Sequence, residues 1–142
     1  MKISEVMTSE VDLVNPGTAI RDAARRMRDD HVGALPVGEN DRLVGMVTDR
    51  DIVVRAVAED RPSGNTAVRN VMSEHIYYCF DDDDLESAAH IMAEHQVKRL
   101  PVLNRDKRLV GIVALADLAL KEPEAAKLAL QGISEPSGSP RR

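Results

Sequence analysis

The chain has 142 residues with a net charge of −5, and Cys79 is its one cysteine. This length fits one ordinary domain, and a lone cysteine excludes an internal disulfide. The acidic balance argues against a general affinity for nucleic acid, because binding to phosphate backbones needs clustered positive charge. No apolar run approaches the roughly 20 residues that cross a bilayer, and no signal-peptide segment follows Met1, so we expect a cytoplasmic protein without a membrane partner.

The first half of the chain carries the periodicities of helices and strands. Ile20, Ala23, Ala24 and Met27 fall at positions i, i+3, i+4 and i+7, which predicts the buried stripe of an amphipathic helix. We expect Thr18 to cap the start of this helix. The other elements predicted here are a lead-in helix, a short strand, two hairpin strands and a closing helix, at residues 1–8, 11–14, 34–37, 43–47 and 49–58.

The second half of the chain repeats the first. Three segments return in the same order, residues 6–8 as 71–73, residues 35–37 as 100–102, and residues 43–51 as 109–117. One extra residue in the second hairpin moves the offset between matching positions from 65 to 66. The chain is therefore an internal duplication of a strand-helix-strand-strand-helix unit.

Such a unit has a sheet with one apolar face that its two helices only partly cover. We therefore expect a mixed α+β fold, in which the two β-α-β-β-α repeats pack sheet to sheet with pseudo-twofold symmetry. The predicted parts are repeat one with its lead-in helix, repeat two, a C-terminal helix and a disordered tail, at residues 1–62, 63–121, 122–133 and 134–142. Pro123 stands in the first turn of the C-terminal helix, where proline is favoured, and the tail is rich in Ser, Pro, Gly and Arg.

Thr48 and Asp51 place a hydroxyl and a carboxylate three residues apart, where a strand passes into a helix. A helix N-terminus has free N–H groups and a partial positive charge, so this position is suited to gripping a sugar phosphate. The same residues are also typical of a helix cap. Ligand binding and capping alone therefore both remain open as interpretations of the pair.

With both copies of residues 33–37 and 43–51 in place, the chain resembles a tandem pair of CBS domains, or Bateman module, over residues 1–121. It is most similar to small stand-alone bacterial CBS proteins of the hypoxic-response type. The resemblance implies a pair of repeats that binds an adenine-containing ligand between them, with AMP, ADP or ATP first and S-adenosylmethionine or NAD as alternatives. It also implies a homodimer of CBS pairs.

The resemblance assigns roles to individual residues. Asp51 would accept hydrogen bonds from the ribose hydroxyls, Thr48 would contact phosphate or ribose, and Arg50 would contact phosphate. Backbone groups around Thr18 would meet the edge of the adenine. The residues implied for the apolar wall against the adenine are Pro36, Val37, Met46 and Val47. The basic residues implied for the phosphates of this same ligand are Lys98 and Arg99.

The second copy of the motif departs from the first at one position. Ala114 replaces the threonine, although Gly111 and Asp117 are retained. Because a hydrogen bond to a charged group contributes about 1.5 to 3 kcal/mol, we expect affinity at the second site to be roughly 10- to 100-fold lower. The residues of this weaker site would be Asp117, Ala114, Pro101 and Val113.

Other polar clusters have simpler interpretations. Residues 81–84 are four aspartates, which we interpret as a helix start and solvated charge rather than a cation site. The four histidines show no metal-site spacing, and no nucleophile with a base is evident. The sequence thus predicts a non-catalytic regulatory module that senses an adenosine nucleotide and acts on an unidentified protein, without metal or catalytic cofactor. The alternative is a ligand-free interaction scaffold.

Overall fold

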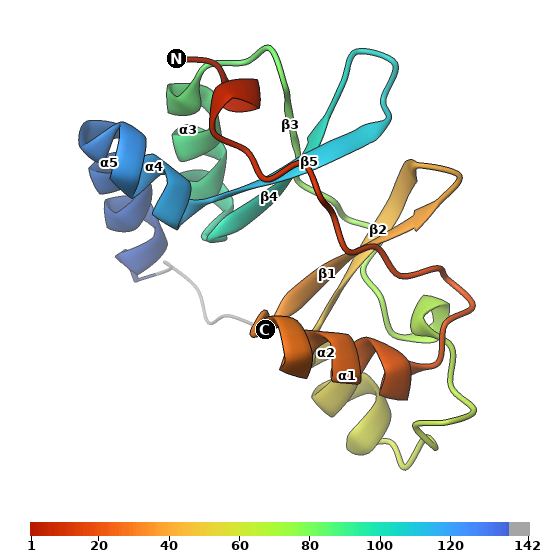
Figure 1. Ribbon diagram of the computed structural model, residues 1–142. Coiled ribbons are helices and arrows are strands. Elements are labelled where there is room, and N and C mark those ends of the chain that lie inside the picture. Colours follow the sequence, from red (N-terminus) through yellow and green to blue (C-terminus); the bar gives the residue numbers. More distant parts are fainter. Residues whose placement is uncertain (137–142) are drawn as a thin grey trace. The chain divides into compact units, whose positions relative to one another are not determined.

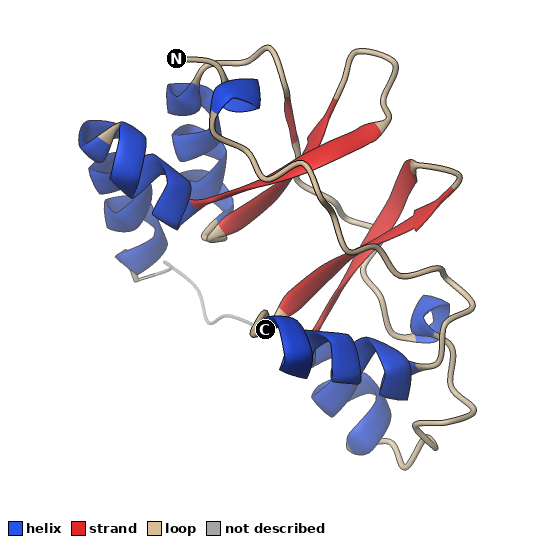
Figure 2. Ribbon diagram, in the orientation of Figure 1, coloured by secondary structure: helices blue, strands red, loops and turns tan. Residues whose placement is uncertain are grey.

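The computed structural model describes residues 1–136, and the chain divides into two compact units. One unit is Asp12–Ile76, and the other joins Met1–Val11 to the chain from Tyr77 onward. Each unit has its own hydrophobic core, between one small sheet and its helices. Figure 2 shows that the main helices of each unit gather on one side of its strands.

The unit Asp12–Ile76 is built on the antiparallel hairpin of β1 (Ala34–Glu39) and β2 (Arg42–Thr48). The helix α1 (Ile20–Asp30) buries Ile20, Ala23 and Met27, as its periodicity predicts. Beyond β2 the chain forms one turn of α-helix, α2 (Asp49–Ile52), and then a π-helical segment, η2 (Val53–Val57). A short 3₁₀ helix, η3 (Val68–Asn70), completes the unit (Figure 1).

The other unit has a three-stranded sheet in the order β3 (Cys79–Phe80), β4 (Arg99–Leu103) and β5 (Leu109–Ala114). β3 is parallel to β4, and β4 is antiparallel to β5. The remaining elements are the 3₁₀ helix η1 and the helices α3, α4 and α5, at Ile3–Glu5, Leu85–His95, Leu115–Lys121 and Pro123–Ser134. α5 packs against α3 and α4 and buries three alanines, Ala125, Ala126 and Ala129 (Figure 1).

Several predicted elements differ from those observed. The lead-in helix is reduced to η1, and the strand expected at residues 11–14 is reduced to a single bridge between Val14 and Val37. The closing helix of the first repeat becomes π-helical after Ile52. α5 has Pro123 at its first position and includes Ser134. The tail predicted from residue 134 lies outside the described residues from 137 onward.

The lead-in segment of each repeat packs on the hairpin of the other repeat. Thr8 and Ile112 exchange two backbone hydrogen bonds of 2.9 Å, while Met46 and Ser73 exchange bonds of 2.9 and 2.8 Å. Glycine permits this close approach, because a Cβ on Gly111 would lie 2.9 Å from the Thr8 carbonyl oxygen. The sequence repeats at 1–62 and 63–121 and the compact units therefore divide the chain differently.

Within residues 1–136 no helix is long and apolar enough to cross a membrane.

Candidate functional site

Thr48 and Asp51 form a reciprocal capping box at the start of α2. The Asp51 N–H donates to the Thr48 hydroxyl at 3.0 Å, and the Thr48 N–H donates to the Asp51 carboxylate at 2.9 Å. Thr48 is extended, with φ −117° and ψ 163°, so its side chain folds back over the first turn of the helix. Capping is thus shown for this pair, and it places the hydroxyl and the carboxylate side by side.

The Asp51 carboxylate keeps acceptor capacity after capping. One oxygen, Oδ2, takes the Thr48 N–H, while Oδ1 lies 4.0 Å from the Arg55 Nε. The Asp51 side chain is 16% exposed, so it is shielded but reachable from solvent. An ionised carboxylate offers about four lone-pair sites, which leaves room for two hydroxyl donors such as those of a ribose.

The prediction that Thr18 caps α1 is wrong. The N-cap residue is Ala19, and the Thr18 hydroxyl accepts a hydrogen bond from the Asn15 N–H at 3.2 Å. The Thr18 N–H donates to the Asn15 carbonyl, and the Thr18 carbonyl accepts from the Val68 N–H at 2.8 Å. The Thr18 N–H is therefore used within the turn, and the Thr18 carbonyl holds the turn against η3.

The apolar residues implied for the adenine wall divide between the two faces of the hairpin. Pro36 pairs with Met46 across the strands, whereas Val37 and Val47 are 0% exposed and belong to the core under α1. Because side chains alternate along a strand, Val37 and Val47 point into the core. Their implied contact with the adenine stays a prediction. Pro36, which is also buried, and half-buried Met46 form the pair on the opposite face.

The second copy reproduces half of the capping box. The Ala114 N–H donates to the Asp117 carboxylate at 2.8 Å, and Ala114 has the same extended backbone as Thr48. No hydroxyl is present to accept the Asp117 N–H. Pro101 pairs with Ile112, whereas Val113 is 0% exposed in the core. The ligand role implied for Val113 stays a prediction, as for Val47.

Lys98 and Arg99 are exposed at the start of β4. The Lys98 carbonyl accepts a hydrogen bond from the Leu115 N–H at 2.8 Å, which joins this position to the start of α4. Among the ion pairs found within residues 1–136, none involves either of these two side chains. The expectation that they serve the ligand held by Asp51 joins residues of two units and stays a prediction.

The aspartates at 81–84 are largely tied into local structure. Arg105 Nη2 lies 2.7 Å from an Asp82 carboxylate oxygen, and the same guanidinium stacks 4.1 Å from the centre of the Phe80 ring. The hydrogen bond from Arg105 is the main cause that lowers the pKa of Asp82 below its ordinary value. Asp83 accepts the Phe80 N–H at 3.0 Å. The carboxylates of Asp82 and Asp83 are therefore used in contacts that hold this loop in place.

Cys79 is buried, and His95 belongs to a stacked ring pair. Burial raises the pKa of the Cys79 thiol to about 12, so the thiol stays protonated at neutral pH. His95 stacks on Tyr77 with ring centres 3.7 Å apart. No group of three or more His, Cys, Asp or Glu side chains within residues 1–136 is arranged to hold a metal ion.

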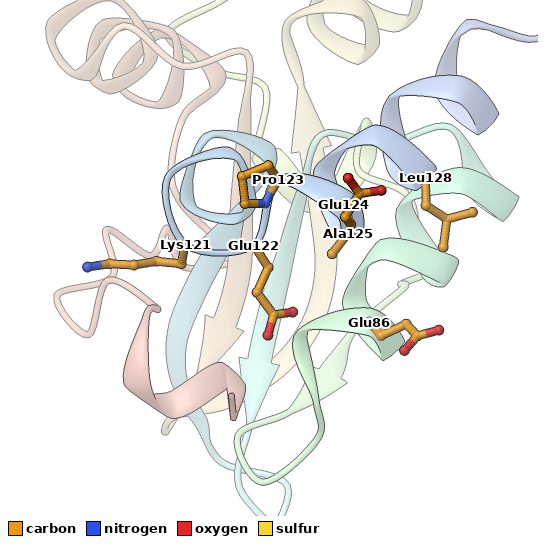
Figure 3. A pocket seen from close by; sticks show the side chains of 7 residues that line it. All are labelled: Glu86, Lys121, Glu122, Pro123, Glu124, Ala125 and Leu128. Atoms are coloured by element: carbon orange, nitrogen blue, oxygen red, sulfur yellow. The ribbon is translucent and has the colours of Figure 1, made fainter.

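A pocket lies where α4 meets α5, and none of its lining residues is one predicted for a ligand. Three glutamates, Glu86, Glu122 and Glu124, line it together with one cation, Lys121. Figure 3 shows Lys121 extending away from these glutamates. The pocket wall is therefore acidic, which is unfavourable for a phosphate.

Arg55 was missed by the sequence reasoning. Its Nη1 donates to the carbonyl oxygens of Val71 at 3.1 Å and Met72 at 3.3 Å. Its Nε lies 4.0 Å from the Asp51 carboxylate. Its place four residues after Asp51 on the helix was a signal available in the sequence, because charged residues at this spacing lie on one face. The contact with residues 71 and 72 was not available from the sequence alone.

Comparison with known proteins gives a consistent match. The CBS domain family matches residues 3–57 and 68–123. The CBS domain-containing protein YhcV of Bacillus subtilis is 43% identical over 134 residues, which cover 93% of this chain and 94% of YhcV.

Solved structures match over most of the chain as well. A crystal structure of Hypoxic Response Protein I with two coordinated zinc ions has a TM-score of 0.79 and 36% identity, covering 87% of this chain and 100% of that chain. The CBS domain pair of protein MJ0100, in complex with 5′-methylthioadenosine and S-adenosyl-L-methionine, has a TM-score of 0.72 and 21% identity, covering 84% of this chain and 94% of that chain.

Proposed function

Since the chain belongs to the CBS domain family, we propose that it is a non-catalytic regulatory module that binds an adenosine-containing ligand at Thr48 and Asp51. The observation that carries this proposal is the partly shielded Asp51 carboxylate, which is held in place by capping and retains free acceptor sites. Charge-assisted hydrogen bonds from two ribose hydroxyls are the strong kind that such a carboxylate can accept.

AMP, ADP and ATP are the ligands proposed first, with S-adenosylmethionine and NAD as alternatives. In the MJ0100 pair, the two bound compounds share an adenosine group, and the likeness of that pair to this chain is one of fold. A phosphate-bearing ligand would also give a role to the exposed cations Arg50, Lys98 and Arg99. A cytoplasmic location and a regulated partner protein stay predictions.

The experiment is a thermal-shift series with AMP, ADP, ATP, S-adenosylmethionine and NADH at millimolar concentration. A ligand at 100 times its dissociation constant adds about 2.7 kcal/mol, which raises the midpoint by roughly 5 to 10 °C for a domain of this size. We expect a shift with at least one nucleotide. No shift with any of the five would favour the alternative function, a ligand-free interaction scaffold.

Matched variants locate the site. Asp51→Asn keeps an acceptor for the Thr48 N–H but removes the charge that would hold the ribose, so it should abolish most of the shift. Asp117→Asn makes the same change in the second copy and should leave most of the shift in place. A shift that survives the first substitution and disappears with the second would place the ligand in the other copy.

We also propose that the protein is a homodimer. Three valines of η2, Val53, Val54 and Val57, are 46 to 64% exposed on neighbouring positions of the helix. Exposed apolar side chains that gather on one face are typical of an association surface. A second copy is the partner proposed for this face.

A further inference from the structure

Arg55 links two parts of its unit that are far apart in sequence. Its Nε lies 4.0 Å from the Asp51 carboxylate, and its Nη1 donates to the backbone carbonyl oxygens of Val71 and Met72. A guanidinium has five donors in a rigid planar fork, so one arginine is able to serve a carboxylate and two carbonyls together. Asp51 and the segment at residues 68–73 therefore share one positively charged partner.

The segment at residues 68–73 is itself docked on β2. Ser73 and Met46 exchange two backbone hydrogen bonds, of 2.8 and 2.9 Å. This docking requires a residue without a side chain at position 45, because a Cβ on Gly45 would lie 2.7 Å from the Ser73 carbonyl oxygen. The docked strand residue Met46 stands two positions before Thr48, so the segment contacts the strand that delivers the capping box.

The second repeat lacks this link. Lys121 is the residue that corresponds to Arg55, and none of the hydrogen bonds or ion pairs found within residues 1–136 joins it to Asp117 or to the lead-in segment of its unit. A lysine presents one point charge and has no fork. Moreover, Arg55 lies in η2, the one π-helical segment within residues 1–136, and π-helical turns occur frequently at functional sites.

We propose that Arg55 is a positioning residue, which orients the Asp51 carboxylate for the ribose and makes this orientation depend on docking of the segment at residues 68–73. This inference rests on the proposed function for its ligand. Because Arg55 has both partners, release of the segment removes the geometry that holds the guanidinium beside Asp51. By linkage, a ligand that prefers the oriented carboxylate must in turn favour the docked segment.

The test compares Arg55→Met with the matched control Lys121→Met. Amide hydrogen exchange without ligand is the first measurement, and loss of the arginine should raise exchange at Ser73 and Met46 by about tenfold, since a hydrogen bond to a charged group is worth at least that factor. The control should leave exchange at these two amides unchanged. Equal exchange in Arg55→Met and the wild type would overturn the link between Arg55 and the segment.

The second measurement separates positioning from general loosening of the structure. In the wild type, ADP should bind about tenfold more tightly than 2′-deoxy-ADP, because the deoxy compound lacks one of the hydroxyls that Asp51 would accept. Arg55→Met should reduce this ratio towards one, whereas a purely structural defect would weaken both probes equally and keep the ratio. An unchanged ratio would therefore overturn the positioning role.

Failure of the proposed function has a different signature. If the wild type binds neither ADP nor 2′-deoxy-ADP and gives no thermal shift with the other adenosine compounds, the ligand site is wrong. The positioning role would then be overturned as well, while raised exchange in Arg55→Met would still establish the docking link.

Discussion

The Thr48 hydroxyl accepts the Asp51 N–H while the Asp51 carboxylate accepts the Thr48 N–H, at 3.0 and 2.9 Å. The corresponding residues Ala114 and Asp117 make only the second of these two bonds, at 2.8 Å. The two copies have nearly the same backbone at the cap, with φ −117° in both. Within the two capping boxes, the difference is therefore the Thr48 hydroxyl.

This difference predicts opposite effects of two substitutions on stability. Thr48→Ala should lower the free energy of unfolding by about 1 kcal/mol, and Ala114→Thr should raise it by up to about 1 kcal/mol, because each changes one N-cap hydrogen bond. Urea denaturation followed by circular dichroism measures both effects. A loss of stability in Ala114→Thr would contradict the equivalence of the two caps.

The crossing of α3 and α5 predicts a strong effect of one added methyl group. A Cβ on Gly132 would lie 2.3 Å from the Cβ of Ala93 and 2.5 Å from its Cα, and neither atom is able to move without its helix. Gly132→Ala should therefore lower the free energy of unfolding by about 1 to 3 kcal/mol through overpacking.

Gly64→Ala is the control for this crossing, since its Cβ would meet only the end of the flexible Arg21 side chain, at 3.0 Å. Urea denaturation of the two variants should show a clear loss of stability in Gly132→Ala and a much smaller one in the control. Equal stabilities would mean that α5 is not held as closely to α3 as the structure shows.

The Arg105 and Asp82 pair predicts an effect of pH. Arg105 lowers the pKa of Asp82 in the folded protein, chiefly by a side-chain hydrogen bond. The contribution of this group to stability is therefore present above the unfolded pKa, about 3.9, and is lost as the pH falls through the lower folded pKa. Carboxyl NMR titration measures the pKa directly.

Arg105→Gln should return the pKa of Asp82 to its ordinary range. Lys2→Gln is the control, because Lys2 is the smallest of the named causes that lower this pKa. An Asp82 titration that is the same in the wild type and in Arg105→Gln would show that the pair does not persist in solution.

The exposed valines of η2 predict the effect of charge on association. A Val54→Glu, Val57→Glu double variant should be monomeric at concentrations where the wild type is a dimer, because the proposed contact would bury two charges from each protomer. Light scattering coupled to size exclusion measures the mass. Leu130→Glu, at a 51% exposed apolar position in the other unit, should remain dimeric. A monomeric wild type would contradict the homodimer.

Local pattern was enough to predict the duplication, the family and the order of the main elements. The sequence predicted the strands at 34–37 and 43–47 and the helix that buries Ile20, Ala23 and Met27. These elements were predictable because their hydrophobic periodicity involves residues close together in the sequence. The motif at Thr48 and Asp51 was also located in this way. Its two interpretations, ligand binding and capping alone, differ in whether a ligand contacts the helix start. The local sequence pattern does not contain this information.

The tertiary structure decided how distant segments meet. Packing under α1 determines which face of the hairpin Val37 and Val47 occupy. The pairing of Met46 with Ser73 depends on the close approach of the chain at Gly45. Arg55 acquired its carbonyl partners because residues 71 and 72 fold back beside η2. Contacts between segments far apart in sequence depend on the geometry of the whole unit. The capping box and the spacing of Asp51 and Arg55 were therefore available from the sequence, and the contact of Arg55 with residues 71 and 72 was not.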